Sequence, residues 1–283
     1  MKMNELKETE CVEVGDYVNS ITVKNEKNNY GTREWASTTI NILTGCEHDC
    51  KYCYAKSMAV RFHKVIPQNW KCEQVRMNSI KKRYKKMNGR IMYPSSHDIT
   101  PTHLGYHIDE LKKILSVGNE VLIVTKPHLD CIKHLCSELN DFKHQILFRF
   151  TIGSADSTVL KFWEPCAPSF EERMECIKFA HNEGFQTSVS CEPMLDFNIS
   201  AVISAASPFV TDKIWIGKAN ELLKRLTLNG SSDMTTMTQA HQLIQWQSND
   251  NNILMLYDTY REDPKIMWKD SISKVLRKHN RIQ

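Results

Sequence analysis

Long apolar runs are missing from this sequence of 283 residues. The longest are as short as Val121-Leu122-Ile123-Val124, whereas a transmembrane helix needs about 20 consecutive apolar residues, so we expect no membrane span. Residues 1–8 are charged and lack the apolar stretch of a secretory signal peptide. Internal repeats and low-complexity tracts are absent as well. We therefore expect a globular protein of the cytoplasm.

A strong charge imbalance is missing too. The formal net charge is +4, with 41% hydrophobic and 25% charged residues, which is typical of a soluble globular protein. Such a mild positive charge permits a nucleic acid as a partner without requiring one. One stretch is densely basic, Lys81-Lys82-Arg83-Tyr84-Lys85-Lys86, here called the basic segment. It fits either the solvated face of a helix or a patch that contacts phosphates, with the tyrosine stacking on a base.

A second C-x₂-C pair is missing, although the chain contains ten cysteines. Three of them, Cys46, Cys50 and Cys53, form a C-x₃-C-x₂-C run, which would arise by chance about 0.01 times in such a chain. Without a signal peptide, this many cysteines indicate a reducing compartment with free or metal-bound thiols. Three thiolates can hold an iron–sulfur cluster and leave one iron open to a substrate or cofactor. We favour this open cluster.

Other interpretations of the cysteine run explain less of it. A structural zinc site has four ligands, and the only local candidates for the fourth are His48 and His63. A ferredoxin-type run ends in a cysteine followed by proline, but Cys166 is followed by Ala167. Buried structural cysteines would not require the spacing. A non-catalytic iron–sulfur or zinc-binding interaction module remains the alternative to an enzyme.

Short β-branched runs alternate with segments of helical period. Strands are expected at residues 38–43, 90–93, 120–125, 145–152, 185–191 and 213–217, and helices at 55–62, 73–87, 109–115, 130–139, 169–184 and 199–206. Further helices are expected at 238–247 and 265–278. This alternation predicts an α/β fold, a partial (β/α)₆ TIM-type barrel with a C-terminal helical extension. We expect an N-terminal lead (1–36), the barrel core (37–220) and C-terminal helices packed on the barrel (221–283).

Polar or reactive groups follow all six expected strands. Parallel α/β sheets bind ligands at the carboxyl ends of their strands, so we look for the site there. The residues in these places are Gly45-Cys46, Ser95-Ser96-His97-Asp98, Thr125-Lys126, Thr151 with Ser154, Cys191-Glu192, and Lys218 with Asn220. The sequence therefore predicts that they gather at one rim of the barrel.

The chain resembles the radical S-adenosylmethionine (SAM) superfamily over roughly residues 37–217. The resemblance is carried by Asn41-Ile42-Leu43-Thr44-Gly45-Cys46 and by Cys53-Tyr54-Ala55, with the aromatic Tyr52 just before the third cysteine. Thr125-Lys126 and Phe148-Arg149-Phe150-Thr151 are similar to the spore photoproduct lyase-like group. Ser190-Cys191-Glu192-Pro193-Met194-Leu195 is similar to the phage-associated group.

The resemblance implies an enzyme with two cofactors, a [4Fe–4S] cluster and SAM. The reduced cluster would cleave SAM into methionine and a 5′-deoxyadenosyl radical, which abstracts a hydrogen atom from the substrate. The sequence does not identify this substrate, and a nucleic acid is one candidate. An electron donor such as flavodoxin or ferredoxin is implied as a partner.

The resemblance also implies roles for individual residues. Cys46, Cys50 and Cys53 would bind the cluster, and the backbone at Tyr52 would meet the adenine. The methionine amino end would lie at Ser96 and Asp98, the SAM carboxylate at Lys126, and the ribose at Thr151 or Ser154.

Two departures from the family pattern affect the expected reaction. No Gly-Gly-Glu follows the second expected strand. Ser95 occupies the place of the hydrogen-donating cysteine of the lesion-repairing lyases, and a hydroxyl cannot return a hydrogen atom as a thiol does. Cys191 is the remaining cysteine expected at the barrel mouth, and we regard it as the catalytic candidate.

Overall fold

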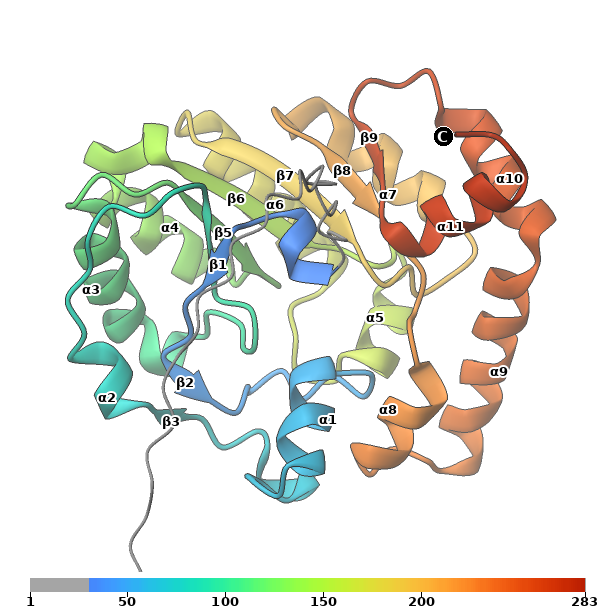
Figure 1. Cartoon of the computed structure of the whole chain (residues 1–283), viewed down its shortest axis with the longest axis horizontal. Helices are drawn as coiled ribbons and strands as arrows, with labels where there is room; N and C mark the ends of the chain where they lie inside the picture. Colours follow the sequence, from blue (N-terminus) through green and yellow to red (C-terminus); the bar gives the residue numbers. More distant parts are fainter. Residues whose placement is uncertain (1–30, 283) are drawn as a thin grey trace, which may run out of the picture.

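A parallel sheet of seven strands forms the centre of the molecule (Figure 1). The computed structural model describes residues 31–282. In spatial order the strands are β1 (Thr38–Thr39), β4 (Ile91–Tyr93), β5 (Val121–Thr125), β6 (Ile146–Thr151), β7 (Gln186–Cys191), β8 (Ile214–Ile216) and β9 (Ile266–Trp268). All neighbours pair in parallel, and the order ends at β1 and β9 without closing the barrel.

The helices lie between or after the strands, and some of them pack against one face of the sheet. They are α1 (Tyr54–Arg61), α2 (Met77–Ile80), α3 (Leu104–Leu115), α4 (Leu129–Glu138), α5 (Ser157–Trp163), α6 (Phe170–Asn182), α7 (Ile199–Ala206), α8 (Leu222–Leu228), α9 (Met234–Ser248), α10 (Asp250–Tyr260) and α11 (Asp270–Lys278). Short 3₁₀ turns lie at η1 (Gly31–Glu34), η2 (Pro67–Asn69), η3 (Pro101–His103), η4 (Asn140–Gln145) and η5 (Ser207–Phe209). No helix within residues 31–282 is long and apolar enough to cross a membrane.

The main core lies between the sheet and its helices. Alternate strand residues such as Ile123, Phe148 and Val189 are fully buried there against α3, α4, α6 and α7. The inner face is more polar. Arg149 of β6 donates to Ser188 of β7 at 2.9 Å and pairs with Asp212 at 3.0 Å. The outer face thus supplies apolar burial, while the inner face is free to carry chemistry.

The partial α/β barrel expected from the sequence is confirmed, and all six expected strands belong to the sheet. The first is split. β1 pairs with β4, whereas β2 (Leu43–Thr44) pairs antiparallel with the short β3 (Gln74–Val75). The expected helix at 169–184 is present as α6, and the Ser169 hydroxyl caps it by accepting from the Glu172 N–H. The fold class therefore follows from the alternation of elements.

Two expected helices are wrong in part. Of residues 73–87, only Met77–Ile80 are helical, and the basic segment runs on without regular structure. Of residues 265–278, the first part forms β9, a seventh strand beside β8, and the helix begins at Asp270. The last strand of the sheet thus comes from the region expected to be helical. Of the expected N-terminal lead, residues 1–30 lie outside the described residues.

Candidate functional site

The cysteine run forms a loop between β2 and α1, at the carboxyl ends of the strands. Gly45 fixes its entry, because its φ of +97° is a conformation that side chains rarely adopt. A Cβ there would lie 2.7 Å from the Trp70 carbonyl oxygen and 2.8 Å from that of Cys72. The next N–H, that of Cys46, donates to the same Trp70 oxygen at 2.9 Å. This glycine therefore allows the loop to pack against the chain that follows α1.

Two contacts hold the far end of the loop. The Cys53 sulfur caps α1 by accepting from the Lys56 N–H at 3.3 Å. The Asn229 side-chain amide donates to the carbonyl oxygens of Lys51 and Cys53, at 2.9 and 3.0 Å. Because Asn229 lies directly after α8, the C-terminal part of the chain helps to shape the cysteine loop.

The three cysteine side chains share the same charged neighbours. Cys46 and Cys50 are each 5% exposed, and Cys53 is half-buried. Burial raises the pKa of all three thiols, the Asp98 carboxylate raises each further, and the Lys126 ammonium lowers each. The structure thus brings the three cysteines, Asp98 and Lys126 to one place, as the sequence predicts for the rim.

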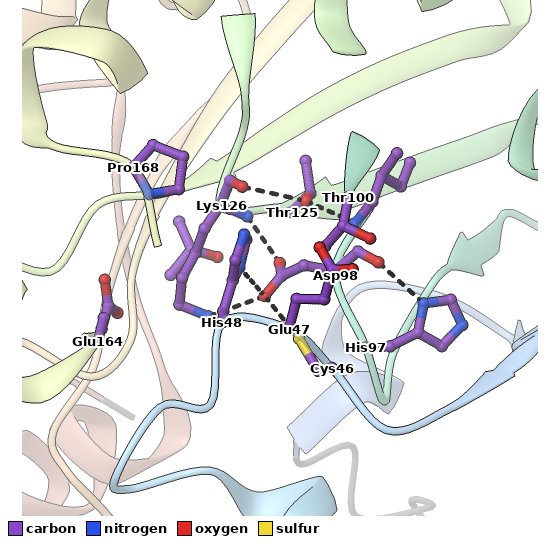
Figure 2. Close-up of polar contacts among 12 residues, drawn as sticks. Cys46, Glu47, His48, His97, Asp98, Thr100, Thr125, Lys126, Glu164 and Pro168 are labelled. Atoms are coloured by element: carbon purple, nitrogen blue, oxygen red, sulfur yellow. Dashed lines mark hydrogen bonds and ion pairs between the residues drawn. The ribbon is translucent and has the colours of Figure 1, made fainter. Parts of the chain in front are cut away.

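Asp98 is the polar centre of this place (Figure 2). Its carboxylate accepts from the Lys126 backbone N–H at 2.7 Å, and it pairs with the Lys126 ammonium at 3.3 Å. It also lies 2.9 Å from His48 Nδ1 and accepts from the Cys46 thiol at 3.7 Å. Burial alone would raise the pKa of Asp98, but Lys126 and His48 hold it well below its usual value. The group is therefore an anion that faces the cysteine loop.

A pair of histidines, which no pattern in the sequence indicates, connects Asp98 with the surface. His48 Nε2 lies 2.8 Å from His128 Nε2, and His128 Nδ1 lies 3.8 Å from a Glu172 carboxylate oxygen. Burial and the neighbouring His48 lower the pKa of His128. His48 also forms a compact group with Cys46 and Asp98. That group holds one cysteine, so it does not complete the zinc site considered for His48; His63 is exposed.

Ser96 and His97 lie beside Asp98 but have different environments. The Ser96 hydroxyl oxygen is buried and has no hydrogen-bond partner among the described residues. His97 Nε2 accepts from the backbone N–H groups of Ile42 and Leu43, at 3.2 and 3.3 Å. Burial lowers the pKa of His97 to about 4, so this histidine is a neutral structural acceptor. Ser96 is therefore the residue with a free polar atom.

A buried ion pair fixes the side chain of Tyr52. The Tyr52 hydroxyl donates to Glu164, whose second oxygen pairs with Arg173. Arg173 also donates to the carbonyl oxygens of Thr151 and Pro168, at 3.0 and 2.9 Å. This network joins the cysteine loop to the end of β6 and to α6. Neither Glu164 nor Arg173 was expected in the site, because no local pattern relates them to Tyr52.

The remaining predicted site residues occupy three different settings. Thr151, at the end of β6, is 9% exposed. The Ser154 hydroxyl already donates to Asp196 and accepts from the Asp156 N–H at 2.8 Å. Cys191 is fully buried in the core between sheet and helices, where burial raises its pKa. It therefore lies on the helix-facing side of the sheet instead of the expected barrel mouth, and its catalytic role stays a prediction.

These residues fit an iron–sulfur cluster with a ligand on its open iron. The cluster would take three thiolates, which the loop presents from one side of the site. Near them are one ammonium and one carboxylate, which can bind the charged ends of an amino acid. The unpartnered Ser96 hydroxyl comes two residues before this carboxylate in the chain.

Comparisons of the sequence with known proteins agree with this chemistry. The sequence model of the radical SAM superfamily matches residues 40–200. An uncharacterized protein of Acidianus two-tailed virus is 26% identical over 176 residues, covering 58% of this chain and 57% of that protein. Another from Methanocaldococcus jannaschii is 24% identical over 180 residues, covering 62% of this chain and 67% of that protein. The chain thus spans little more than half of the viral relative's length.

Solved structures share the fold at low sequence identity. A spore photoproduct lyase variant with bound AdoMet and dinucleoside spore photoproduct has a TM-score of 0.50 and 16% identity, covering 81% of this chain and 75% of that chain. SuiB of Streptococcus suis bound to the precursor peptide SuiA has a TM-score of 0.52 and 14% identity, covering 87% and 52%. SuiB bound to S-adenosylmethionine has a TM-score of 0.50 and 14% identity, covering 82% and 50%.

Proposed function

Because this chain belongs to the radical SAM superfamily, we propose that Cys46, Cys50 and Cys53 bind its [4Fe–4S] cluster and that SAM binds beside them. When bound, the reduced cluster supplies the electron that cleaves SAM into methionine and a 5′-deoxyadenosyl radical. The observation that carries the assignment is the shared position of Asp98 and Lys126 beside all three thiols. The chain is accordingly an enzyme.

Asp98 and Ser96 bind the amino group of SAM. In the protein without cofactor, the Cys46 thiol donates to Asp98 at 3.7 Å. A cysteine that ligates iron loses that proton, so Asp98 loses a donor and gains a negative neighbour. An ammonium group satisfies the carboxylate in place of the thiol. The Ser96 hydroxyl, which is buried without a partner two residues before Asp98, accepts a second hydrogen bond from the same group.

Lys126 binds the carboxylate of SAM. Burial alone would lower its pKa, but Asp98 raises it well above the usual value, so the side chain stays an ammonium. Its side chain is 13% exposed, which makes a charge-assisted hydrogen bond stronger than it would be in water. We therefore assign the SAM carboxylate to Lys126 and the SAM amino group to Asp98.

SAM binding by variants with intact clusters tests these roles. Lys126→Met removes the ammonium and keeps most of the side chain. Lys218→Met is a matched control, because Lys218 also follows a strand, β8, but has Asp250 and Lys278 as its charged neighbours. We expect Lys126→Met to weaken SAM binding and Lys218→Met to leave it unchanged. Equal affinities in both variants would remove Lys126 from the site.

The adenosine part of SAM lies toward Tyr52 and the end of β6 in this proposal. The Glu164–Arg173 pair holds Tyr52 and the Thr151 carbonyl in fixed positions, which supports a rigid binding surface there. Thr151 and Ser154 remain the proposed ribose contacts. Since the Ser154 hydroxyl already donates to Asp196, that pair would bind the ribose jointly, with Asp196 as the acceptor.

A nucleic acid is the proposed substrate class, and the basic segment favours it. Lys81, Lys82, Arg83 and Lys85 are exposed, and none forms an ion pair with a described residue. The segment is not a helix face, because α2 ends at Ile80 and no helix follows before residue 90. The Tyr84 hydroxyl donates to Glu110. Binding to an oligonucleotide should weaken with salt by a log–log slope of about −0.7 to −0.9 per phosphate contact. Absence of such binding would exclude this substrate class.

The state of the cysteines supports a reducing compartment, which we propose is the cytoplasm. All nine cysteines within residues 31–282 are free. Cysteine pairs of extracellular proteins are commonly oxidised to disulfides, whereas thiols persist in the cytoplasm. Fractionation of the native host's cells, followed by detection of the chain with an antibody, would test the compartment.

A further inference from the structure

Large apolar side chains are exposed directly after the cysteine loop. Tyr54, at the start of α1, is 55% exposed; Phe62 and Ile66, just after its end, are 57% and 59% exposed. Single exposed apolar residues are common on protein surfaces, but a group on one short segment marks an interaction site. The core does not account for this group, since none of the three packs in it.

Two cations accompany these side chains. Arg61 and Lys64 are exposed, and neither forms an ion pair with any residue in the range 31–282. The Arg61 guanidinium lies 5.9 Å from the centre of the Phe62 ring. We call Tyr54, Arg61, Phe62, Lys64 and Ile66 the α1 face. It combines apolar anchors with unpaired positive charge, which is the complement of an acidic protein surface.

The α1 face adjoins both ends of the cysteine loop. Cys53, the least buried of the three proposed ligands, is the N-cap of α1. At the other end, a hollow of about 660 Å³ is lined by Lys64 and Ile66 and by Gly45, the residue before Cys46. Figure 1 shows α1 at the edge of the molecule, away from the seven-stranded sheet. The face therefore covers the outside of the loop, whereas Asp98 and Lys126 occupy its inside.

We propose that the α1 face is the docking surface for an acidic electron-transfer protein that carries a reduced flavin or iron–sulfur centre. This inference rests on the proposed function, because SAM and substrate occupy the inside of the loop and leave the outside for the electron donor. In each transfer the donor's centre is oxidised by one electron, and the cluster held by the three cysteines is reduced by one. Arg61 and Lys64 steer the acidic partner, and Phe62 anchors it.

The composition of the α1 face distinguishes this partner from a nucleic acid. It has three large apolar side chains and two cations, and Ile66 cannot stack on a base. Grooves for single strands instead follow the phosphates with many cations and place aromatic rings between them. The basic segment has that cationic density, and the α1 face does not.

Charge reversal tests the docking surface. The variant Arg61→Glu with Lys64→Glu inverts its charge. The matched control is Lys133→Glu with Lys178→Glu, which reverses two exposed lysines of α4 and α6 that belong to no proposed site. Reconstituted wild type and variants are titrated with flavodoxin, and the dissociation constant is measured by calorimetry at low and high salt. SAM cleavage is then driven either by reduced flavodoxin or by dithionite, which needs no docking surface.

We expect the Arg61→Glu, Lys64→Glu variant to bind flavodoxin at least about tenfold more weakly than wild type. Its dissociation constant should also depend much less on the salt concentration. Its cleavage of SAM should fall with flavodoxin and match wild type with dithionite. Phe62→Ser should weaken binding at both salt concentrations. Unchanged flavodoxin affinity, an equal loss in the control, or an α1 face that binds only oligonucleotide would overturn the inference. Failure of the wild type to cleave SAM with dithionite would instead refute the proposed function. The binding titration would still show whether the α1 face is a docking surface for flavodoxin.

Discussion

Replacing Arg173 with methionine should cost a large part of the protein's stability. Arg173 and Glu164 have fully buried side chains and pair with one another. Arg173→Met keeps the length of the side chain but leaves the Glu164 carboxylate buried without its cation. It also removes the donors to the carbonyl oxygens of Thr151 and Pro168.

Breaking a buried ion pair from one side costs about 3–5 kcal/mol, because the remaining charge is uncompensated. A domain is stable by only about 5–15 kcal/mol, so the loss should be easily measured. The assay is urea unfolding of the metal-free, reduced protein, followed by tryptophan fluorescence and circular dichroism. A second variant, Arg173→Met with Glu164→Gln, removes the stranded charge, so we expect it to recover part of the loss.

The comparison of these two variants separates the ion pair from simple loss of packing. If Arg173→Met loses less than about 1 kcal/mol, the pair does not support the loop in the way that its burial indicates. If the double variant is no more stable than Arg173→Met alone, the cost comes from the lost carbonyl contacts and not from the charge of Glu164.

Two further predictions concern single side chains, and one concerns the basic segment. Lys126→Met should weaken SAM binding by about 10- to 150-fold, because a charge-assisted hydrogen bond contributes about 1.5–3 kcal/mol; calorimetry on the cluster-loaded protein measures it. The pKa of His97 is lowered to about 4 in the folded protein. Between about pH 6.5 and 4 the unfolded chain therefore binds more protons at this residue than the folded protein does, so the free energy of unfolding should fall as the pH drops through that window. His97→Gln should flatten this dependence in urea titrations at several pH values, and an unchanged slope would contradict it. Neutralising the lysines and arginine of the basic segment should reduce the salt slope of oligonucleotide binding while SAM cleavage without substrate stays constant.

Six of the seven strands could be predicted, because each of the six has a local sequence pattern of its own. Residues 120–125 and 145–152 are short β-branched or aromatic runs between polar segments, and they form β5 and β6. Parallel strands place their carboxyl ends together, so Asp98 and Lys126 could be expected near the cysteine loop from topology alone. The structure brings them to a separation of 3.3 Å.

The error at residues 73–87 has a tertiary cause. Ile80, Tyr84 and Met87 have the spacing of a helix face, yet the helix ends at Ile80 and residues 82–87 have no regular structure. The Asn119 side chain accepts from the Met87 N–H at 2.7 Å and donates to the Lys85 carbonyl at 3.1 Å. These bonds to the end of α3 replace the bonds that a helix would make within itself. No local pattern near residue 80 could indicate them.

The seventh strand was missed for a similar reason. Residues 266–268 are too short to define a strand by period, and they precede a true helix. β8 supplies the partner, and the Lys269 N–H continues the pairing by donating to the Ile216 carbonyl at 2.9 Å. The His48–His128 contact likewise joins residues far apart in the chain, so only the folded structure brings them together.

The most direct test of a radical SAM centre in this chain is anaerobic reconstitution followed by an assay for 5′-deoxyadenosine. We expect about four irons and four sulfides per chain, and formation of 5′-deoxyadenosine from SAM after reduction with dithionite. Cys50→Ala should lose both the iron and the product. Zinc in place of iron and sulfide, or a fully loaded cluster that leaves SAM intact under reduction, would contradict the central claim that Cys46, Cys50 and Cys53 build a radical SAM centre.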